Sequence, residues 1–196
     1  IDATAFTAHP YQIPTVGWPS DIEGWKVDDL KTYYHTYYAP NNAVMFVVGD
    51  VEPEEIFTLA EKYLGKTPAQ AKPRPVTTKE PEQQGERRVS LVREAESPLL
   101  IFAHHSISGS DVDAPATELL LSILAEGESS RLNQQLVEQQ QLVVEVGESI
   151  NLGFDPGLSY IYVTLPPVGD LDQVEKALDA ELQKFVAGGV TQAELY

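Results

Sequence analysis

The stretch from Tyr37 to Asp50 constrains the fold more than any other part of the chain. An aromatic helix end stops at Pro40, because proline cannot continue a helix, and an Asn-Asn turn follows. Residues 43–48 are then all apolar, a pattern typical of a strand that is buried on both faces. A Gly-Asp break leads into a second helix that begins at Pro53. The sequence therefore predicts helix, turn, buried strand, turn and helix in succession.

The chain divides at a proline-rich stretch, residues 66–87, which lacks apolar periodicity and predicts an extended linker. Beyond it, apolar runs predict strands at 88–92, 99–107, 142–150 and 158–165. Apolar residues at helical spacing predict helices at 113–125, 129–140 and from Asp170 onward. Because strand pairs are followed by helices without regular βαβ alternation, we expect an α+β fold. Its sheet should be mixed but largely antiparallel, with helices covering one face.

Both ends of the sequence indicate a piece of a longer polypeptide. The chain opens at Ile1, and its single methionine is Met45. Near the other end, Thr191 and Glu194 have the spacing of a capping box, which stabilises the start of a helix. We therefore expect the natural chain to continue. Since an excised piece would have lost any signal peptide, the sequence leaves the cellular compartment open.

Acidic residues outnumber basic ones, 30 to 13, and give a formal net charge of −17. A nucleic-acid backbone would be repelled, so nucleic acid is not an expected partner. The charge fits either a cavity that attracts basic peptides or an ordinary solvated acidic surface. The absence of cysteine excludes disulfides and zinc–thiolate sites, and no apolar run approaches the ~20 residues of a membrane-spanning helix.

Histidine is too sparse and unsuitably spaced for a metal centre. His104 and His105 are adjacent on a predicted strand and should point to opposite faces. No H-x-x-E-H, H-E-x-x-H or H-x-H spacing occurs. We expect His9 to be a hydrogen-bonding turn residue and His35 to be solvated. The sequence thus supplies no metal ligand and no catalytic residue, and it does not identify substrate-binding residues.

Two other groups of residues have structural interpretations. Ser129 and Ser130 precede Arg131, an arrangement in which a serine caps a helix and the arginine reaches a nearby carboxylate. The tyrosines from Tyr33 to Tyr38 form one helical face and are expected in the core. From the residues alone, the chain is therefore interpreted as a structural or interaction module.

Three sequence stretches, taken in their order and spacing, resemble one protein family. They are His9-Pro10-Tyr11 with Gly17-Trp18 and Ser20-Asp21-Ile22, then Tyr38-Ala39-Pro40-Asn41-Asn42-Ala43 with Val48-Gly49-Asp50-Val51 and Ala60-Glu61-Lys62-Tyr63-Leu64-Gly65, then Ser129-Ser130-Arg131-Leu132. With them the chain resembles the insulinase/pitrilysin-type (inverzincin) zinc peptidases, close to bacterial members similar to mitochondrial processing peptidase. The bacterial cytoplasm, the periplasm and the cell envelope all remain open for such a protein.

The resemblance implies that the full protein contains units of two similar α+β domains, and that two such units close around a peptide. One unit carries H-x-x-E-H and a distant glutamate, which bind zinc and activate a water molecule. That motif lies upstream of the His-Pro-Tyr stretch in the family, so this chain should lack it. Residues 1–65 would then be the tail of the first, zinc-type domain, residues 66–87 the linker, and residues 88–196 the second, non-zinc domain, truncated at its C-terminal end.

Two positions depart from the family pattern. In many relatives the helix after the Ser-Arg-Leu motif carries an arginine and, seven residues later, a tyrosine that assist substrate or transition-state binding. Val137 and Val144 occupy these places here, and aliphatic side chains cannot donate those hydrogen bonds. The resemblance leaves two interpretations: a zinc-bearing half that takes both residues from its partner half, or a degenerate, non-catalytic half.

The resemblance therefore implies a non-catalytic framework and substrate-chamber domain of a zinc metalloendopeptidase that acts on peptides, with zinc in the parent and none in this piece. Its expected partners are the missing zinc-bearing part of its own chain, a second homologous subunit or half, and a peptide substrate. The alternatives are a scaffold half without peptidase activity, like the core subunits of the respiratory bc1 complex (complex III), and a binding module unrelated to peptidases. Apolar faces within 27–64 would dock on the second domain or pair with a second copy as a homodimer.

Overall fold

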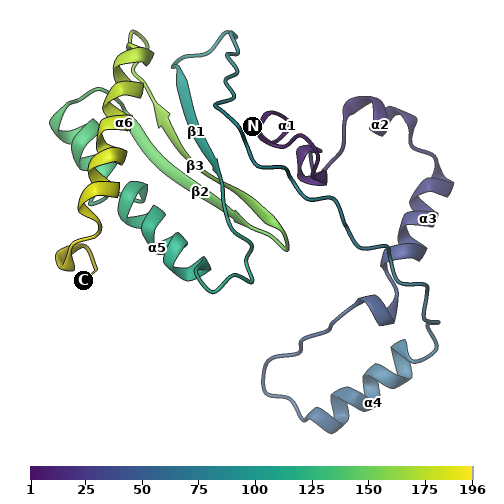
Figure 1. Ribbon diagram of the computed structural model, residues 1–196. Coiled ribbons are helices and arrows are strands. Elements are labelled where there is room, and N and C mark those ends of the chain that lie inside the picture. Colours follow the sequence, from purple (N-terminus) through teal and green to yellow (C-terminus); the bar gives the residue numbers. More distant parts are fainter. Residues whose placement is uncertain (196) are drawn as a thin grey trace. The chain divides into compact units, whose positions relative to one another are not determined.

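The computed structural model describes residues 1–195. They fold into two compact units (Figure 1). The sheet unit comprises Ile1–Thr7 and the chain from Pro81 onward, and the helical unit comprises Ala8–Glu80. Among residues 1–195, no helix is both long enough and apolar enough to cross a membrane.

The sheet unit is built on three antiparallel strands, β1 (Leu99–His105), β2 (Glu145–Leu152) and β3 (Pro156–Thr164), in the order β1-β3-β2. β2 and β3 form a hairpin, and β1 pairs with the other edge of β3, so that Leu100 lies opposite Val163. These strands confirm three of the four predicted ones, with shifts of a few residues at their ends.

The fourth predicted strand, at 88–92, is wrong. These residues belong to no strand, and Val89, Leu91 and Val92 are 61, 75 and 95% exposed. A β-strand exists only through hydrogen bonds to a neighbouring strand, and no strand of residues 1–195 pairs with this segment. A short apolar run therefore indicates a capacity for pairing and not pairing itself.

One face of the sheet is covered by α5 (Ala114–Ala125), α6 (Leu171–Gly188) and η3, a π-helical segment at Asn133–Gln139 (Figure 1). α6 begins where the sequence predicts, and Asp170 caps it: its Oδ1 accepts from the backbone N–H groups of Asp172 and Gln173, at 3.0 and 3.2 Å. Gly189 ends α6 with φ +65°, a left-handed conformation that suits glycine. The predicted α+β architecture, an antiparallel sheet with helices on one face, is confirmed.

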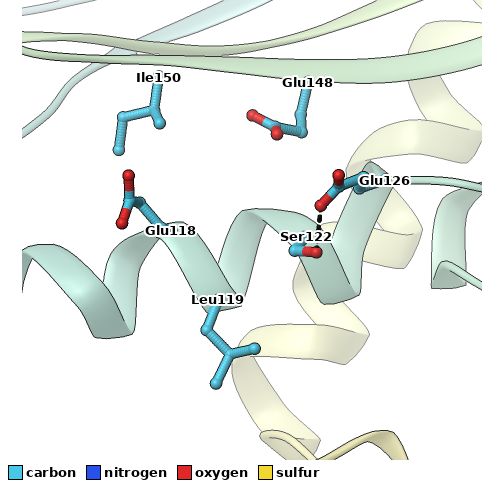
Figure 2. A pocket seen from close by; sticks show the side chains of 6 residues that line it. All are labelled: Glu118, Leu119, Ser122, Glu126, Glu148 and Ile150. Atoms are coloured by element: carbon cyan, nitrogen blue, oxygen red, sulfur yellow. Dashed lines mark hydrogen bonds between the residues drawn. The ribbon is translucent and has the colours of Figure 1, made fainter. Parts of the chain in front are cut away.

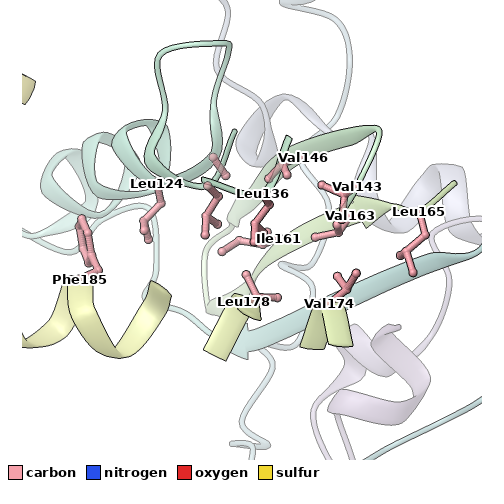
Figure 3. Close-up of a cluster of buried hydrophobic side chains, with 12 residues drawn as sticks. Leu124, Leu136, Val143, Val146, Ile161, Val163, Leu165, Val174, Leu178 and Phe185 are labelled. Carbon is pink, nitrogen blue, oxygen red and sulfur yellow. The ribbon is translucent and has the colours of Figure 1, made fainter. Parts of the chain in front are cut away.

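The core of the sheet unit lies between this sheet face and the helices (Figure 3). Val146 on β2 and Ile161 and Val163 on β3 point into it, as the two-residue period of a strand requires. On α6, Val174 and Leu178 lie one turn apart and are almost fully buried. The complete buried cluster is Leu124, Ala125, Leu132, Leu136, Val143, Val146, Ile161, Val163, Leu165, Val174, Leu178 and Phe185.

The N-terminal residues contact β1. The short helix α1 (Asp2–Ala5) is followed by Phe6, which is 2% exposed and meets the ring of His105 edge-on at 5.0 Å. His105 Nε2 lies 3.2 Å from the carbonyl oxygen of Ala5. Arg87 donates to the carbonyl oxygens of Thr4 and Ala5. These contacts attach the first residues of the chain to the sheet unit.

The helical unit contains η1 (Pro10–Gln12), α2 (Pro19–Gly24), α3 (Val27–Tyr37), η2 (Pro40–Asn42) and α4 (Pro53–Leu64), which confirms both predicted helices. The carboxylate of Asp29 accepts from the backbone N–H of Lys26 at 3.0 Å and closes the first turn of α3. Both tryptophans of the chain, Trp18 and Trp25, lie in this unit and are 43 and 53% exposed. Only His9 and Ala39 are buried in it.

Two predictions for the helical unit are wrong. Residues 43–48 do not form a strand, and Val44, Phe46 and Val48 are 79, 84 and 96% exposed. The tyrosine face that was expected in the core is exposed as well, although the rings of Tyr34 and Tyr38 stack at 5.1 Å. Both errors have one cause: this unit contains no sheet against which an apolar strand or helix face could pack.

Candidate functional site

A pocket of about 410 Å³ between α5 and β2 gathers three glutamates of the sheet unit. Glu118 lies on α5, Glu126 directly follows it, and Glu148 points from β2 toward the helix (Figure 2). Ser122, one turn before Glu126, donates a hydrogen bond to the Glu126 carboxylate. Ile150 and Leu119 complete the lining. The helical spacing of 118, 122 and 126 places these polar groups along one side of α5.

Glu148 is the electrostatically unusual member of this pocket. Its pKa is raised above the ordinary value, first because burial penalises the carboxylate and then because Glu126 and Glu118 repel it. Its Oε2 is buried and accepts no hydrogen bond within residues 1–195. A carboxyl group in this setting holds its proton to a higher pH than a solvated one, so the pocket is an acidic surface with one weakened acid.

The lining of the pocket is acidic and apolar. Its lining contains no histidine, lysine or arginine. Within residues 1–195, no group of three or more His, Cys, Asp or Glu side chains is arranged to hold a metal ion.

An apolar groove of about 740 Å³ lies on the helical side of the sheet unit. Its lining comes from β1, α5 and the second half of α6 with the residues after it: Phe102, His104, Leu120, Leu124, Asp179, Leu182, Gln183, Phe185, Val186, Ala187, Gly189 and Val190. The groove has an apolar wall with few polar groups. It is suited to packing and supplies no chemistry of its own.

The histidines have the roles that the sequence predicts. His104 lies in the apolar groove and stacks edge-on against Phe102 at 4.8 Å, whereas His105 contacts Phe6, so the two face opposite sides of the sheet. His9 Nδ1 accepts from the backbone N–H of Tyr11 at 3.3 Å, which confirms a turn residue. His35 is exposed at the end of α3.

Arg131 reaches a carboxylate, as predicted. It forms a two-pronged ion pair with Glu194, with Nη2 2.6 Å from Oε2, and also donates to the carbonyl oxygen of Gly189 at 2.6 Å. Its guanidinium lies 4.5 Å from the ring centre of Phe185. Hydrogen bonding from Arg131, and then from Thr191, lowers the pKa of Glu194 to about 2.

The serine before Arg131 acts differently from a helix cap. Ser130 is 3% exposed, and its hydroxyl donates to the carbonyl oxygen of Gly127 at 2.8 Å instead of accepting from a helical N–H. It therefore closes the turn that precedes η3. Val137 packs at the margin of the core, and Val144 is 60% exposed. Neither valine offers a polar group to a substrate, in agreement with the departure noted in the sequence.

Sequence comparison decides what this arrangement represents. Residues 24–196 match the family described as the peptidase M16 inactive domain. This chain belongs to that family. The M16 assignment agrees with the insulinase/pitrilysin-type resemblance carried by the Tyr-Ala-Pro-Asn-Asn and Ser-Ser-Arg-Leu stretches.

Relatives of this M16 domain are named as zinc proteases. It is 30% identical over 197 residues to zinc protease PqqE of Helicobacter pylori, covering 98% of this chain and 44% of the relative. An uncharacterized zinc protease of Mycobacterium leprae is 25% identical, with 98 and 43% covered. The chain thus spans less than half the length of the curated relatives that it matches.

Solved structures share the fold. A protease from Helicobacter pylori superposes with a TM-score of 0.91 at 29% identity, over 99% of this chain and 48% of the other. A peptidase M16 inactive domain from Pseudomonas fluorescens gives a TM-score of 0.85 at 22% identity, over 99 and 47%. A chain of complex III from Candida albicans gives 0.78 at 16% identity, over 98 and 47%. At the last two identities the likeness concerns the fold alone.

The sequence analysis missed the glutamate pocket. Glu118, Ser122 and Glu126 lie at four-residue intervals, which is a readable signal for one side of a helix. Nothing in the sequence shows that Glu148, on a strand over twenty residues later, faces that side. Only the packing of β2 against α5 brings the three carboxylates together.

Proposed function

We propose that this M16 domain is the non-catalytic framework and substrate-chamber half of a zinc metalloendopeptidase that cleaves peptides. The observation that carries the proposal is the match of residues 24–196 to the inactive domain of a peptidase family. The naming of PqqE as a zinc protease supports zinc chemistry in the parent protein. The framework role is also supported by Val137 and Val144, which replace side chains that would contact a substrate.

Under this proposal zinc belongs to a part of the parent outside residues 1–196. The partners are that zinc-bearing part, a second homologous subunit or half, and the peptide substrate. We assign residues 1–65 to the tail of the zinc-type domain, 66–87 to the connecting linker and 88–196 to the inactive domain. The exposed apolar faces of α3 and α4 are consistent with a segment that belongs beside a missing neighbour.

A scaffold half without peptidase activity is the second candidate function. The likeness to a complex III chain at 16% identity agrees with it only at the level of the fold. Identity to a protein named as a zinc protease is nearly twice as high, and this difference favours the peptidase.

The test compares the full-length parent with residues 1–196 alone. Zinc is quantified by mass spectrometry, and hydrolysis is followed with fluorogenic peptides before and after chelation. The parent is expected to contain zinc and to lose activity reversibly on chelation, whereas residues 1–196 should neither bind zinc nor cleave. Hydrolysis by residues 1–196 would contradict the framework role, and an inactive, zinc-free parent would favour the scaffold.

A further inference from the structure

The chain passes between its two units twice, once at Thr7–Ala8 and once at Glu80–Pro81. Glu80 joins the two passages, because its Oε2 accepts from the backbone N–H groups of Ala8 and His9, each at 2.9 Å. All three of these residues belong to the helical unit. The first and the last residues of that unit are therefore held together by one carboxylate oxygen.

Arg87 makes the corresponding contact within the sheet unit. Its Nη1 donates to the carbonyl oxygen of Thr4 at 3.3 Å and also to that of Ala5. The carboxylate of Glu80 thus binds backbone amides, whereas the guanidinium of Arg87 binds backbone carbonyls, and both contacts are charge-assisted hydrogen bonds. The residues joined rise in number along one passage as they fall along the other. The two passages therefore run antiparallel.

Prolines stiffen the backbone at the Glu80 contact. Pro81 follows Glu80 and Pro10 follows His9, and a residue before proline is restricted to extended backbone conformations. His9 has φ −69° and ψ 142°, in agreement with that restriction, and is 4% exposed. Because both partners are already restricted by the covalent chain, little conformational entropy is lost when the contact forms.

The shorter passage leaves few residues between the two contacts. Only Phe6 and Thr7 lie between the residues that Arg87 and Glu80 bind. Phe6 is 2% exposed and meets the ring of His105 at 5.0 Å, so it is fixed in the sheet unit. Turning within this passage is therefore confined to the backbone around Thr7.

The longer passage has slack. Residues 81–86 lie between the same two contacts, which is six residues where the shorter passage has two. The three peptide steps of the shorter passage reach at most about 11 Å, whereas the seven steps of the longer one reach about 25 Å. The shorter passage therefore sets the separation of the two contacts, and residues 81–86 follow as a loop.

The proline-rich stretch before Glu80 is held at a second place. Asn41 Nδ2 donates to the carbonyl oxygen of Gln70 at 2.8 Å, and Asn41 Oδ1 accepts from the backbone N–H of Gln70 at 3.0 Å. Residues 70–80 are therefore attached to the helical unit at both ends, although their composition is typical of a mobile linker.

We propose that Glu80 and Arg87 form a paired clasp that makes the two passages into one hinge, with Thr7 as its pivot and residues 81–86 as its slack loop. The clasp keeps residues 70–80 with the helical unit while the units turn about the pivot. The inference does not depend on the proposed function, because it uses only the contacts of residues 1–9 and 70–87.

Hydrogen exchange at single-residue resolution in the full-length parent tests the Glu80 half of the clasp. Glu80→Ala removes the acceptor, so the amides of Ala8 and His9 are expected to exchange at least ~10-fold faster than in the wild type. Glu80→Gln is the rescue variant, because one amide oxygen can accept both hydrogen bonds, and it should keep the protection. Glu82→Ala, in the slack loop, is the control and should change nothing.

Two results of this exchange experiment would overturn the clasp. The first is equal exchange of the Ala8 and His9 amides in the wild type and in Glu80→Ala. The second is faster exchange throughout the helical unit in Glu80→Ala, because Glu80 would then stabilise the unit as a whole and would not act at the passages alone.

Inserted glycines test the pivot in the same parent. Nitroxide labels on Glu54→Cys and Asp172→Cys, at exposed positions of α4 and α6, report the distance between the units by pulsed electron paramagnetic resonance. Two glycines inserted after Thr7 should broaden the distance distribution, whereas two glycines inserted after Gln84 should leave it unchanged, because that loop already has slack. Equal broadening by both insertions, or broadening by neither, would contradict a pivot at Thr7.

Discussion

The sheet unit and the helical unit are built from similar kinds of residues and differ in what those residues contact. The sheet unit gathers twelve hydrophobic side chains into one buried cluster. The helical unit buries only His9 and Ala39, although it also contains aromatic helices and a run of apolar residues. Both units form the helices that their sequences predict. The difference teaches that the signals that mark a helix are local in the sequence, whereas the hydrogen bonds of a strand come from another strand.

The largest effect is expected from a substitution in the core of the sheet unit. Leu178 is completely buried on α6, so Leu178→Ala in residues 1–196 should lower the free energy of unfolding by about 2–5 kcal/mol. Phe46→Ala removes a larger side chain from the helical unit and should change it by less than about 0.5 kcal/mol, because Phe46 is 84% exposed. Urea denaturation followed by far-ultraviolet circular dichroism measures both, and comparable losses would show that the two units are equally packed.

The next effect concerns close packing around a glycine. A Cβ atom on Gly147 of β2 would come within 2.2 Å of the Tyr162 ring on β3, so Gly147→Ala should destabilise the sheet by about 1–3 kcal/mol. Gly24, in the helical unit, has nothing within 4 Å of the same position, and Gly24→Ala should not destabilise. Thermal melts of the two variants distinguish the outcomes. A neutral Gly147→Ala would mean that Tyr162 moves aside freely.

A smaller effect depends on pH. The pKa of Glu194 is lowered to about 2 by Arg131, so its contribution to stability is present above the ordinary value of 4.5 and is lost as pH falls toward 2. Glu194→Gln should therefore be less stable than the wild type at pH 7 and equally stable near pH 2. In the helical unit, Asp28 and Lys31 are 3.7 Å apart and largely exposed, and Asp28→Asn should have little effect at either pH. A pH-independent Glu194→Gln difference would contradict the ion-pair explanation.

The smallest expected effect is a gain in stability, whereas the preceding ones are losses. Because the pKa of Glu148 is raised by burial and by its acidic neighbours, ionisation destabilises the folded state, and this penalty appears as pH rises through the folded pKa. Glu148→Gln should stabilise the sheet unit at pH 7, by roughly 0.5 kcal/mol, and should have no effect at pH 3. Glu54→Gln on exposed α4 is the matched control and should change the stability little at pH 7. A loss of stability of Glu148→Gln at pH 7 would show that the Glu148 carboxylate stabilises the folded state.

Sequence reasoning succeeded where the deciding interactions are close along the chain. The start of a helix at Asp170 and the strand at 158–165 are predicted from local patterns, and the structure confirms both as α6 and β3. It failed at 43–48 and 88–92, because the hydrogen bonds of a strand come from residues that the pattern does not specify. The Glu148 pocket was missed for a related reason. The four-residue spacing of Glu118, Ser122 and Glu126 can be read from the sequence, whereas tertiary packing decides which strand faces them.

The placement of Trp18 and Trp25 has a practical consequence. Both indoles of the chain belong to the helical unit, so tryptophan fluorescence of residues 1–196 reports only on the half that has almost no core. An emission-based melting curve would follow the local environment of these two exposed rings and would not register the opening of the sheet. Peptide-bond circular dichroism sees both halves, and disagreement between the two signals would be the spectroscopic signature of a molecule whose parts unfold separately.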